Sequence, residues 1–354
     1  MASRTSPLSG RGVTFALGTY SAASGRPFAG VVLDDQVVAL VALVDDMAKA
    51  GYPVPPAVDV LELLEDWSQA FPALEAAISA LRDKGLESAG DARFRISDLR
   101  PLPPVNLPRQ VFCAGANYFK HVVDLICDSP PEEVPGTVKM DKSQLRAYAV
   151  DLMTRRRQHG EPYFFNKPVS TVTGALDPII LPPLAKKPDW ELELGVVIGK
   201  SARRVSRAEA MSHVAGYTIV NDISDRVLLW RRDDVKQMGT DWVAGKSAPS
   251  YLPTGPFMLP AAFVSDPSAL QLRLRLNGDI KQDESTADMI FDIPRLIEYL
   301  SSMVQLWPGD LICTGSPAGN GTHFNRFLRP GDVVESTISG LGMQRNPVMA
   351  EVPI

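Results

Sequence analysis

Cysteine, histidine, excess basic charge and long apolar runs are all scarce in this sequence of 354 residues, which has three cysteines and four histidines. The cysteines form no CxxC pair and have no histidine at zinc-site spacing, so neither a disulfide framework nor a structural zinc site is expected. Scattered free cysteines fit a reducing compartment, and we predict a cytoplasmic protein. No apolar run approaches the roughly 18 residues that span a bilayer, and residues 1–11 lack the apolar core of a secretory signal, so no membrane contact is expected.

The charge balance excludes another class of partners. Lys and Arg number 36 against 41 Asp and Glu, a net charge of −5, and the one basic cluster, 155–157, is short. A nucleic-acid-binding domain usually carries a basic patch or stripe, so no nucleic-acid partner is predicted. The hydrophobic content of 45% is enough for a large core, in one large domain or two unequal ones.

The first 105 residues are predicted to form a small α+β domain. Short apolar runs separated by glycine and aspartate predict strands, and Asp34–Asp35 between two of them predicts a hairpin turn. The proline-rich segment 100–105 disfavours both a helix interior and a central strand, so we place a domain boundary at about residue 105. The predicted strands cover 13–17, 29–33 and 37–40, and the predicted helices cover 58–69 and 72–84, the second beginning after Pro72.

Residues 106–354 are predicted to form a second, larger domain in which strands dominate. Many short strands, few helices and Gly/Pro turns predict an α+β, β-rich, barrel-like fold rather than alternating βαβ units. The polar, proline-bearing segment 127–160 is predicted to be a surface insertion with a helix over 141–157. The other predicted elements are strands at 110–114, 179–181, 191–198, 217–222, 270–276, 310–314 and 332–339, and helices at 118–126, 207–214 (with a capping box of Ser206 and Glu209) and 294–303.

Glu191 and Glu193 are the first candidate metal ligands. Residues i and i+2 of a strand share one face, so both carboxylates point the same way in a strand whose continuation is apolar. Like charges beside a core are costly unless a cation joins them, and oxygen ligands favour Mg²⁺, Mn²⁺ or Ca²⁺ over zinc. The alternative is a half-exposed strand with both carboxylates in water, since this spacing is common.

Asp222 offers a third carboxylate where a second apolar strand gives way to a loop. Functional side chains on a rigid scaffold commonly occupy such positions, and three carboxylates leave room in an octahedral site for water and substrate. Arg226, four residues further on, is placed to meet a substrate carboxylate.

Seven motifs follow one another between residues 110 and 348. They are Asn117-Tyr118-x-x-His121, Phe165-Asn166-Lys167-Pro168, Glu191-Leu192-Glu193-Leu194, Asn221-Asp222-x-Ser224-x-Arg226, Gly245-Lys246-Ser247, Gly309-Asp310-Leu311-Ile312-Cys313-Thr314-Gly315-Ser316-Pro317 and Leu328-x-Pro330-Gly331-Asp332-Val333-Val334. Each alone is weak, but together they are highly specific, and by them the chain resembles the fumarylacetoacetate hydrolase family. The resemblance covers the whole C-terminal domain and implies a mixed β-sandwich or barrel-like catalytic fold preceded by a small, variable domain.

The resemblance also implies residue roles. It makes Glu191, Glu193 and Asp222 the metal ligands and Lys246 the active-site lysine. His121, which alone would be interpreted as a surface histidine, would activate water with an acidic partner. That partner is Asp124 here, where many relatives have glutamate, and at this helical spacing the two side chains can reach each other. The implied substrate-binding residues are Tyr118, Lys167, Arg226, Thr314 and Gly315, the last two for a substrate carboxylate.

Two positions depart from the family pattern. Many relatives have a glutamine where this chain has Leu229, and a small residue where it has Asp225. Leu229 suggests a less polar portion of the substrate. The insertion 127–160 lies in the lid region of relatives, and such a lid would close over substrate and exclude water.

The function implied by the resemblance is metal-dependent hydrolysis of a C–C bond in an acylpyruvate or similar 1,3-dicarbonyl 2-oxo acid, by a homodimer. The same metal-enolate chemistry would also serve a decarboxylase, a hydratase or a tautomerase, because the fold does not fix the reaction. The predicted pair of His121 and Asp124 favours hydrolysis, which needs activated water. The alternative from another class is a non-catalytic binding protein stabilised by its metal.

Overall fold

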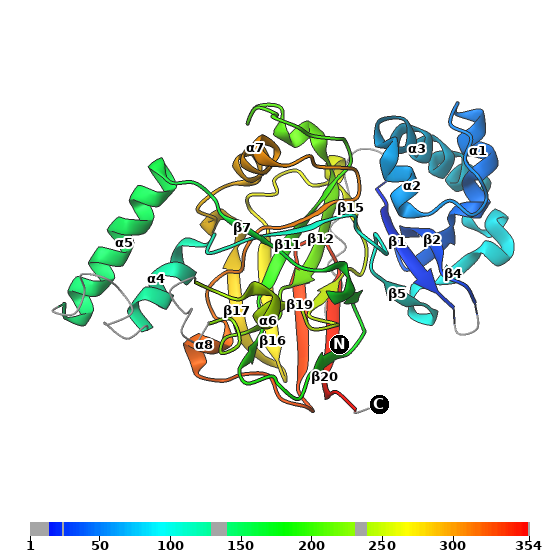
Figure 1. The fold of residues 1–354 in the computed structure, drawn as a ribbon. Coiled ribbons are helices and arrows are strands. Elements are labelled where there is room, and N and C mark those ends of the chain that lie inside the picture. The colour runs from blue at the N-terminus through cyan, green and yellow to red at the C-terminus, as the bar shows by residue number, and fades with distance from the viewer. Residues whose placement is uncertain (1–13, 23–24, 129–139, 231–238, 353–354) are drawn as a thin grey trace.

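The structure, a computed structural model, describes residues 14–22, 25–128, 140–230 and 239–352. Its N-terminal part is a five-stranded antiparallel sheet in the order β4-β3-β2-β1-β5, with three helices packed against it (Figure 1). The elements are β1 (Ala16–Ser21), β2 (Phe28–Leu33), β3 (Gln36–Ala39), α1 (Val44–Lys49), α2 (Val60–Glu65), α3 (Trp67–Lys84), β4 (Arg93–Arg95) and β5 (Arg100–Leu102).

Two local predictions for this part have different outcomes. The hairpin between β2 and β3 is confirmed, and Asp34 adopts the left-handed backbone (φ 57°) that a tight hairpin turn requires. The predicted start of the second helix after Pro72 is wrong, because α3 begins at Trp67 and contains the proline. Pro72 lies in the second turn, where its missing N–H removes one helical hydrogen bond and the apolar face beyond it outweighs that loss.

The N-terminal part packs directly on the rest of the chain. Leu17 and Met258 exchange two backbone hydrogen bonds of 2.9 and 2.7 Å, and the Thr19 hydroxyl donates to Pro104 O at 2.9 Å. One apolar cluster contains side chains from both parts, including Leu17 and Leu311. The predicted boundary near residue 105 lies in the connection from β5 to β6, and the units on either side of it share buried surface.

The larger part contains two mixed sheets and confirms the predicted α+β, sheet-rich fold class. An eight-stranded sheet runs β7-β6-β18-β11-β12-β14-β8 with β15 beside β12, and a five-stranded sheet runs β17-β16-β19-β20-β9. Apolar side chains from β11 and β16 meet in one core between the sheets. The strands are β6 (Val111–Ala114), β7 (Phe164–Asn166), β8 (Val172–Gly174), β9 (Ile179–Leu181), β10 (Pro188–Asp189), β11 (Leu192–Ile198), β12 (Val214–Asn221), β13 (Ser224–Asp225), β14 (Leu252–Thr254), β15 (Leu259–Pro260), β16 (Gln271–Leu276), β17 (Asp279–Ser285), β18 (Leu311–Cys313), β19 (Val333–Ile338) and β20 (Met343–Ala350).

Strand β11 places the candidate ligands, because it is buried on both faces. Leu192, Leu194 and Val196 belong to the core between the sheets. Successive side chains of a strand alternate between its faces, so Glu193 points away from that core. Buried surroundings on both sides make any charge on this strand dependent on nearby partners.

The helices of the larger part are few, as predicted. They are α4 (Phe119–Asp128), α5 (Lys142–His159), α6 (Trp242–Lys246), α7 (Ile293–Met303) and α8 (Gly321–Phe324), with 3-10 turns at Val169–Thr171, Ala210–His213, Ala261–Phe263 and Thr286–Asp288. Within the predicted insertion, α5 lies beside α4 at the edge of the molecule (Figure 1), and both helices contribute to a small apolar cluster. Residues 129–139 of that segment lie outside the described residues. Across the described residues, no helix has the length and apolar character needed to cross a membrane.

The predicted helix 207–214 is wrong, because only the short turn Ala210–His213 forms before β12 begins at Val214. The expected capping box is also incomplete. The Ser206 hydroxyl donates to the Glu209 carboxylate at 2.7 Å, so the serine does not cap a backbone N–H of the next turn.

Gln344 on β20 ties the two sheets together. Its side-chain amide is fully buried and donates to Ile219 O at 2.9 Å, Pro253 O at 3.1 Å and Gly255 O at 3.2 Å.

We predict that Gln344→Leu lowers the free energy of unfolding by about 1–3 kcal/mol, because buried carbonyls lose their donor. Urea denaturation with Met343→Leu, an exposed neighbour, as control checks this, and equal stability of the two variants would contradict it.

Candidate active site

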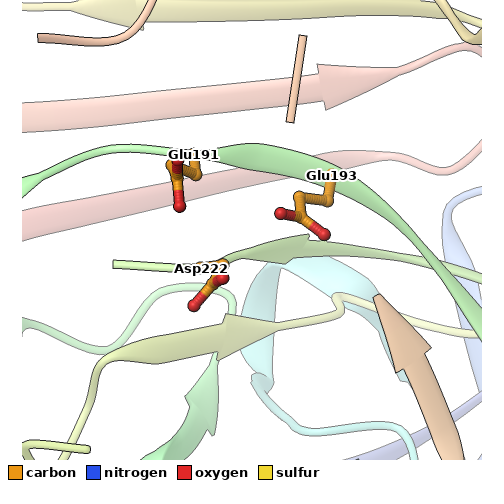
Figure 2. Close-up of side chains that lie close together, drawn as sticks. All are labelled: Glu191, Glu193 and Asp222. Atoms are coloured by element: carbon orange, nitrogen blue, oxygen red, sulfur yellow. The ribbon is translucent and has the colours of Figure 1, made fainter. Parts of the chain in front are cut away.

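Three carboxylates meet at one end of β11 and β12 (Figure 2). Glu191 directly precedes β11, Glu193 lies within it, and Asp222 follows β12. The backbone N–H of Asp222 donates to Glu191 O at 2.9 Å, which fixes the two chain segments side by side. Ligand atoms of all three side chains lie within 4.8 Å of one another, so the structure brings the predicted metal ligands together.

The alternative of two solvated carboxylates on a half-exposed strand is wrong. Glu191, Glu193 and Asp222 are only 5%, 2% and 1% exposed. Burying carboxylates is expensive unless counter-charges or hydrogen bonds compensate them, and neighbouring cations provide most of that compensation here.

Lys246, Lys167 and Arg226 are the compensating cations. Lys246 Nζ donates to Glu191 Oε2 at 2.8 Å and to Asp222 Oδ2 at 2.5 Å. Lys167 Nζ donates to Asp222 Oδ1 at 2.6 Å, and Arg226 donates to Glu191 Oε1 at 2.5 Å. Each cation therefore holds a candidate ligand in place.

The carboxylates of Glu191 and Glu193 differ in their protonation chemistry. Burial opposes the charge on Glu191, but Arg226 and Lys246 outweigh it and lower the pKa of its carboxyl. Burial, followed by the nearby charge of Asp222, raises the pKa of Glu193 well above its usual range. The difference follows from the partners, because Glu193 accepts a hydrogen bond from the backbone N–H of Gly315 at 2.7 Å and has no paired cation among the described residues.

This arrangement fits a divalent cation. The donor set consists only of carboxylate oxygens, which suits Mg²⁺, Mn²⁺ or Ca²⁺. Glu193 is the group that most needs another positive charge, and it faces the same cavity as Glu191 and Asp222. Glu191, Glu193 and Asp222 would hold the ion, while Lys167 and Lys246 keep two of these carboxylates aligned.

His121, in the first turn of α4, lines this cavity and is 7% exposed. Burial lowers the pKa of its imidazole from 6.5 to about 4, so the ring is neutral at neutral pH. Its Nδ1 lies 3.5 Å from the side-chain nitrogen of Asn320, and the direction of this contact depends on the tautomer of the ring. A neutral ring beside the carboxylates can accept a proton.

The predicted pairing of Asp124 with His121 is not found among the described residues. Arg146 of α5 lies 3.3 Å from the Asp124 carboxylate, which is 26% exposed as a side chain. The histidine turns into the cavity wall while the aspartate faces α5, where the arginine competes for it. Asn320 therefore occupies the neighbouring position that Asp124 was expected to fill.

Four of the predicted substrate-binding residues lie behind the cavity rather than along it. Tyr118 and Lys167 are buried, the Thr314 hydroxyl donates to Leu194 O at 2.9 Å, and Gly315 donates its N–H to Glu193. Gly315 has a φ of 94°, and a Cβ there would lie 2.8 Å from Asn117 Cβ, so glycine is required for this close approach. Arg226 does line the cavity, although its guanidinium is already bound to carboxylates.

Sequence reasoning missed several supporting residues. Asp189, fully buried, accepts from Arg226 Nε at 2.8 Å and so orients the guanidinium. Ser224 donates to Glu191 Oε2 at 2.8 Å. Phe165 and Trp242 stack at 4.4 Å, and Lys246 Nζ lies 4.6 Å from the centre of the Phe165 ring. Asp189, Ser224 and Phe165 lie within or beside the family motifs, and this position in the sequence could have identified them as supporting residues.

Asp225, noted in the sequence as an unusual residue, has a structural explanation. Its buried carboxylate accepts four backbone N–H groups, from Lys186 at 2.5 Å, Lys187 at 3.1 Å, and Val227 and Leu228 at 2.9 Å each. It thereby joins the segment before β10 to the turn after β13. Both segments contribute side chains to the cavity, so Asp225 fixes part of its wall.

A mixed-sheet fold with buried carboxylates facing a cavity is typical of enzymes that bind a divalent cation. The family model described as fumarylacetoacetate (FAA) hydrolase C-terminal matches residues 110–349. The chain therefore belongs to the fumarylacetoacetate hydrolase family, as the motifs predicted.

Individual relatives differ in the reactions that their names give. The chain is 34% identical over 282 residues to oxaloacetate tautomerase fahd2, mitochondrial, of Xenopus laevis, covering 78% of this chain and 77% of that protein. It is 42% identical over 191 residues to a 2,4-didehydro-3-deoxy-L-rhamnonate hydrolase of Sphingomonas sp. (strain SKA58), covering 53% of this chain and 65% of that protein. The crystal structure of maleylpyruvate hydrolase from Sphingobium sp. SYK-6 with manganese(II) and pyruvate matches with a TM-score of 0.67 at 25% identity, covering 95% of this chain and 100% of that one.

We predict that Mn²⁺ or Mg²⁺ raises the thermal midpoint of the metal-free protein and that Glu193→Gln removes most of this rise. A ligand present at 100 times its Kd stabilises the folded state by about 2.7 kcal/mol, and the variant loses a charged ligand. Differential scanning fluorimetry with and without EDTA measures the shift. Glu87→Gln, at an exposed side chain, is the control, and an equal shift in both variants would exclude this site.

We also predict that His121 makes the metal-free protein less stable in acid. Its pKa is lowered from 6.5 to about 4, so between these values the unfolded chain binds the extra proton and stability falls as pH falls. The loss from pH 7 to pH 4 is on the order of 3 kcal/mol. Denaturation of wild type and His121→Gln across this range measures the difference, and a wild type that gains stability in acid relative to the variant would contradict it.

Proposed function

We propose that the protein is a divalent-metal-dependent hydrolase that cleaves a C–C bond of an acylpyruvate-type 2-oxo acid. The observation that carries this proposal is a buried His121 in the same cavity as Glu191, Glu193 and Asp222. Hydrolysis needs a base for water beside a site that stabilises negative charge, and the cavity combines both.

The bound cation would polarise the oxo group of the substrate and favour the enolate as leaving group. His121 takes a proton from a water molecule, and the resulting hydroxide adds to the distal carbonyl carbon. The C–C bond then breaks, and its electron pair forms the enolate of the 2-oxo acid. His121 returns the proton to the enolate carbon, so the products are a 2-oxo acid and a carboxylic acid. Lys246, which lines the cavity, adds positive charge next to the oxyanion.

The tautomer of His121 decides whether it can act in this way. If Nε2 is to accept a proton, Nδ1 must already carry one and donate it. Asn320 then has to present its side-chain oxygen, rather than its nitrogen, to Nδ1. In this arrangement Asn320 orients the base without the carboxylate that Asp124 was predicted to supply.

Tautomerisation of a 2-oxo acid is the second candidate. Relatives that cover most of this chain are named oxaloacetate tautomerases, and this reaction needs a base that moves a proton between carbon and oxygen but no water. His121 lacks a carboxylate partner among the described residues, which weakens it as a base for water and keeps this candidate open. A decarboxylase or hydratase would use the same cation and carboxylates.

Further properties extend the proposal. Mn²⁺ is supported by the manganese-bound relative, while Mg²⁺ and Ca²⁺ fit the same oxygen ligands. The homodimer and the cytoplasmic location remain predictions, and several relatives carry the word mitochondrial in their names.

The direct test is loss of the ultraviolet enol absorbance of acylpyruvates in the presence of Mn²⁺. We predict metal-dependent loss that falls at least about 100-fold in His121→Asn, because a general base contributes roughly that much or more. The metal-induced thermal shift should persist in this variant. His159→Asn, at an exposed histidine that does not line the cavity, is the matched control.

The outcomes separate the two candidates. Accelerated keto–enol exchange of oxaloacetate without cleavage of any acylpyruvate would replace hydrolysis by tautomerisation. Unchanged cleavage in His121→Asn would remove the histidine from the mechanism.

A further inference from the structure

The active-site cavity has a volume of about 760 Å³ and two chemically different parts. The polar part contains His121 and the carboxylate cluster with its cations. The other part is an apolar wall, formed by Tyr163, Val227, Leu229, Trp230, Trp242 and Phe327. Pockets of roughly 300–1,000 Å³ enclose drug-sized ligands, so the cavity is larger than a three-carbon 2-oxo acid needs.

Two aromatic members of the apolar wall have exposed side chains. Tyr163 is 43% exposed and Trp230 is 59% exposed. Exposed large apolar side chains that gather at a cavity commonly mark a binding surface, because a ligand that covers them releases water from apolar area. Tyr163 also lies 6.5 Å, ring centre to ring centre, from Trp242, so the aromatic surface is continuous there.

Backbone contacts hold Leu229, a residue of the apolar wall, in place. Leu229 N–H donates to Asp225 O at 3.1 Å, and Asp241 N–H donates to Leu229 O at 2.8 Å. A Cβ at Gly245 would lie 2.8 Å from Leu229 Cα, so glycine lets α6 approach this segment closely. Lys246 is the last residue of α6, so this close approach sets Leu229 at a fixed position relative to the lysine that binds the carboxylates.

The apolar wall offers little to a second carboxylate. Among the described residues that line the cavity, Arg226 and Lys246 are already paired with carboxylates. Lys187 is exposed, and its Nζ lies 5.2 Å from the centre of the Phe327 ring. A charged acyl group would have to leave water for an apolar surface, which is unfavourable without a buried partner.

We propose that the acyl part of the substrate is apolar and flat, most suitably an aryl or arylalkyl group, and that Leu229 and Trp230 select it. This inference rests on the proposed function for the position of the 2-oxo acid end at the carboxylate cluster. A ligand bound there extends its substituent along the wall. The substrate class therefore differs from small dianionic acids such as oxaloacetate.

Binding of 2-oxo acids that lack the acyl group cleaved in the proposed reaction tests the substrate class at the Mn²⁺-loaded protein without requiring hydrolysis. Isothermal titration calorimetry would compare pyruvate, oxaloacetate and phenylpyruvate, which share the head group. Phenylpyruvate should bind about tenfold to a hundredfold tighter than pyruvate, as expected for burying one aromatic ring. Oxaloacetate should gain no comparable advantage.

Variants of wall residues test whether the wall causes the preference for phenylpyruvate. Leu229→Gln and Trp230→Ala should each reduce the phenylpyruvate preference several-fold and leave the pyruvate Kd unchanged, which shows that the head-group site is intact. Trp307→Ala, an exposed tryptophan outside the cavity, should change neither value.

Two results would overturn the inference. Tighter binding of oxaloacetate than of phenylpyruvate, lost in Lys187→Met, would assign a dianionic substrate and leave the proposed reaction standing. Failure of the metal-loaded protein to bind any of the three acids would contradict the proposed function and the substrate class together.

Discussion

The burial of negative charge at the joined ends of β11 and β12 is the constraint on which the site depends. Glu191, Glu193, Asp222 and Asp189 are all buried there, and three cations face them. An unpaired buried charge costs several kcal/mol. Removing one of the cations therefore lowers the stability of the folded protein, because its carboxylate partners stay buried without a counter-charge. Four ionised carboxylates would exceed the three cations by one negative charge, and burial of that charge raises the pKa of Glu193. A divalent cation would reverse that sign, and the cavity would then attract an anionic 2-oxo acid.

The same constraint explains why several residues predicted to bind substrate also hold the carboxylates in place. Lys167 and Gly315 donate to Asp222 and Glu193, and Arg226 is shared between Glu191 and Asp189. Precise metal geometry requires ligands whose rotamers are fixed by surrounding hydrogen bonds. A motif can therefore be highly specific for a family while most of its residues act one step away from the reacting atoms.

The sequence was informative where the signal is local. The alternation of side chains along a strand predicted that Glu191 and Glu193 share one face. The apolar run 179–181 predicted the strand that is β9, and Asp34 predicted the hairpin turn. It failed where distant segments compete. Arg146 of α5 takes the carboxylate of Asp124, and β12 begins where a helix over 207–214 would continue. Neither outcome can be inferred from residue spacing within one element, because each depends on which distant segments the fold brings into contact.

The candidate metal ligands and the apolar wall of the cavity lie on different chain segments. The candidate metal ligands lie within or directly beside β11 and β12, which are buried on both faces and tolerate little change. Half of the apolar wall, Val227, Leu229 and Trp230, lies on the segment after β13, which Asp225 anchors through backbone N–H groups. Because this anchor uses only main-chain donors, we expect the proposed selection of substrate by the wall to be separable from the proposed chemistry.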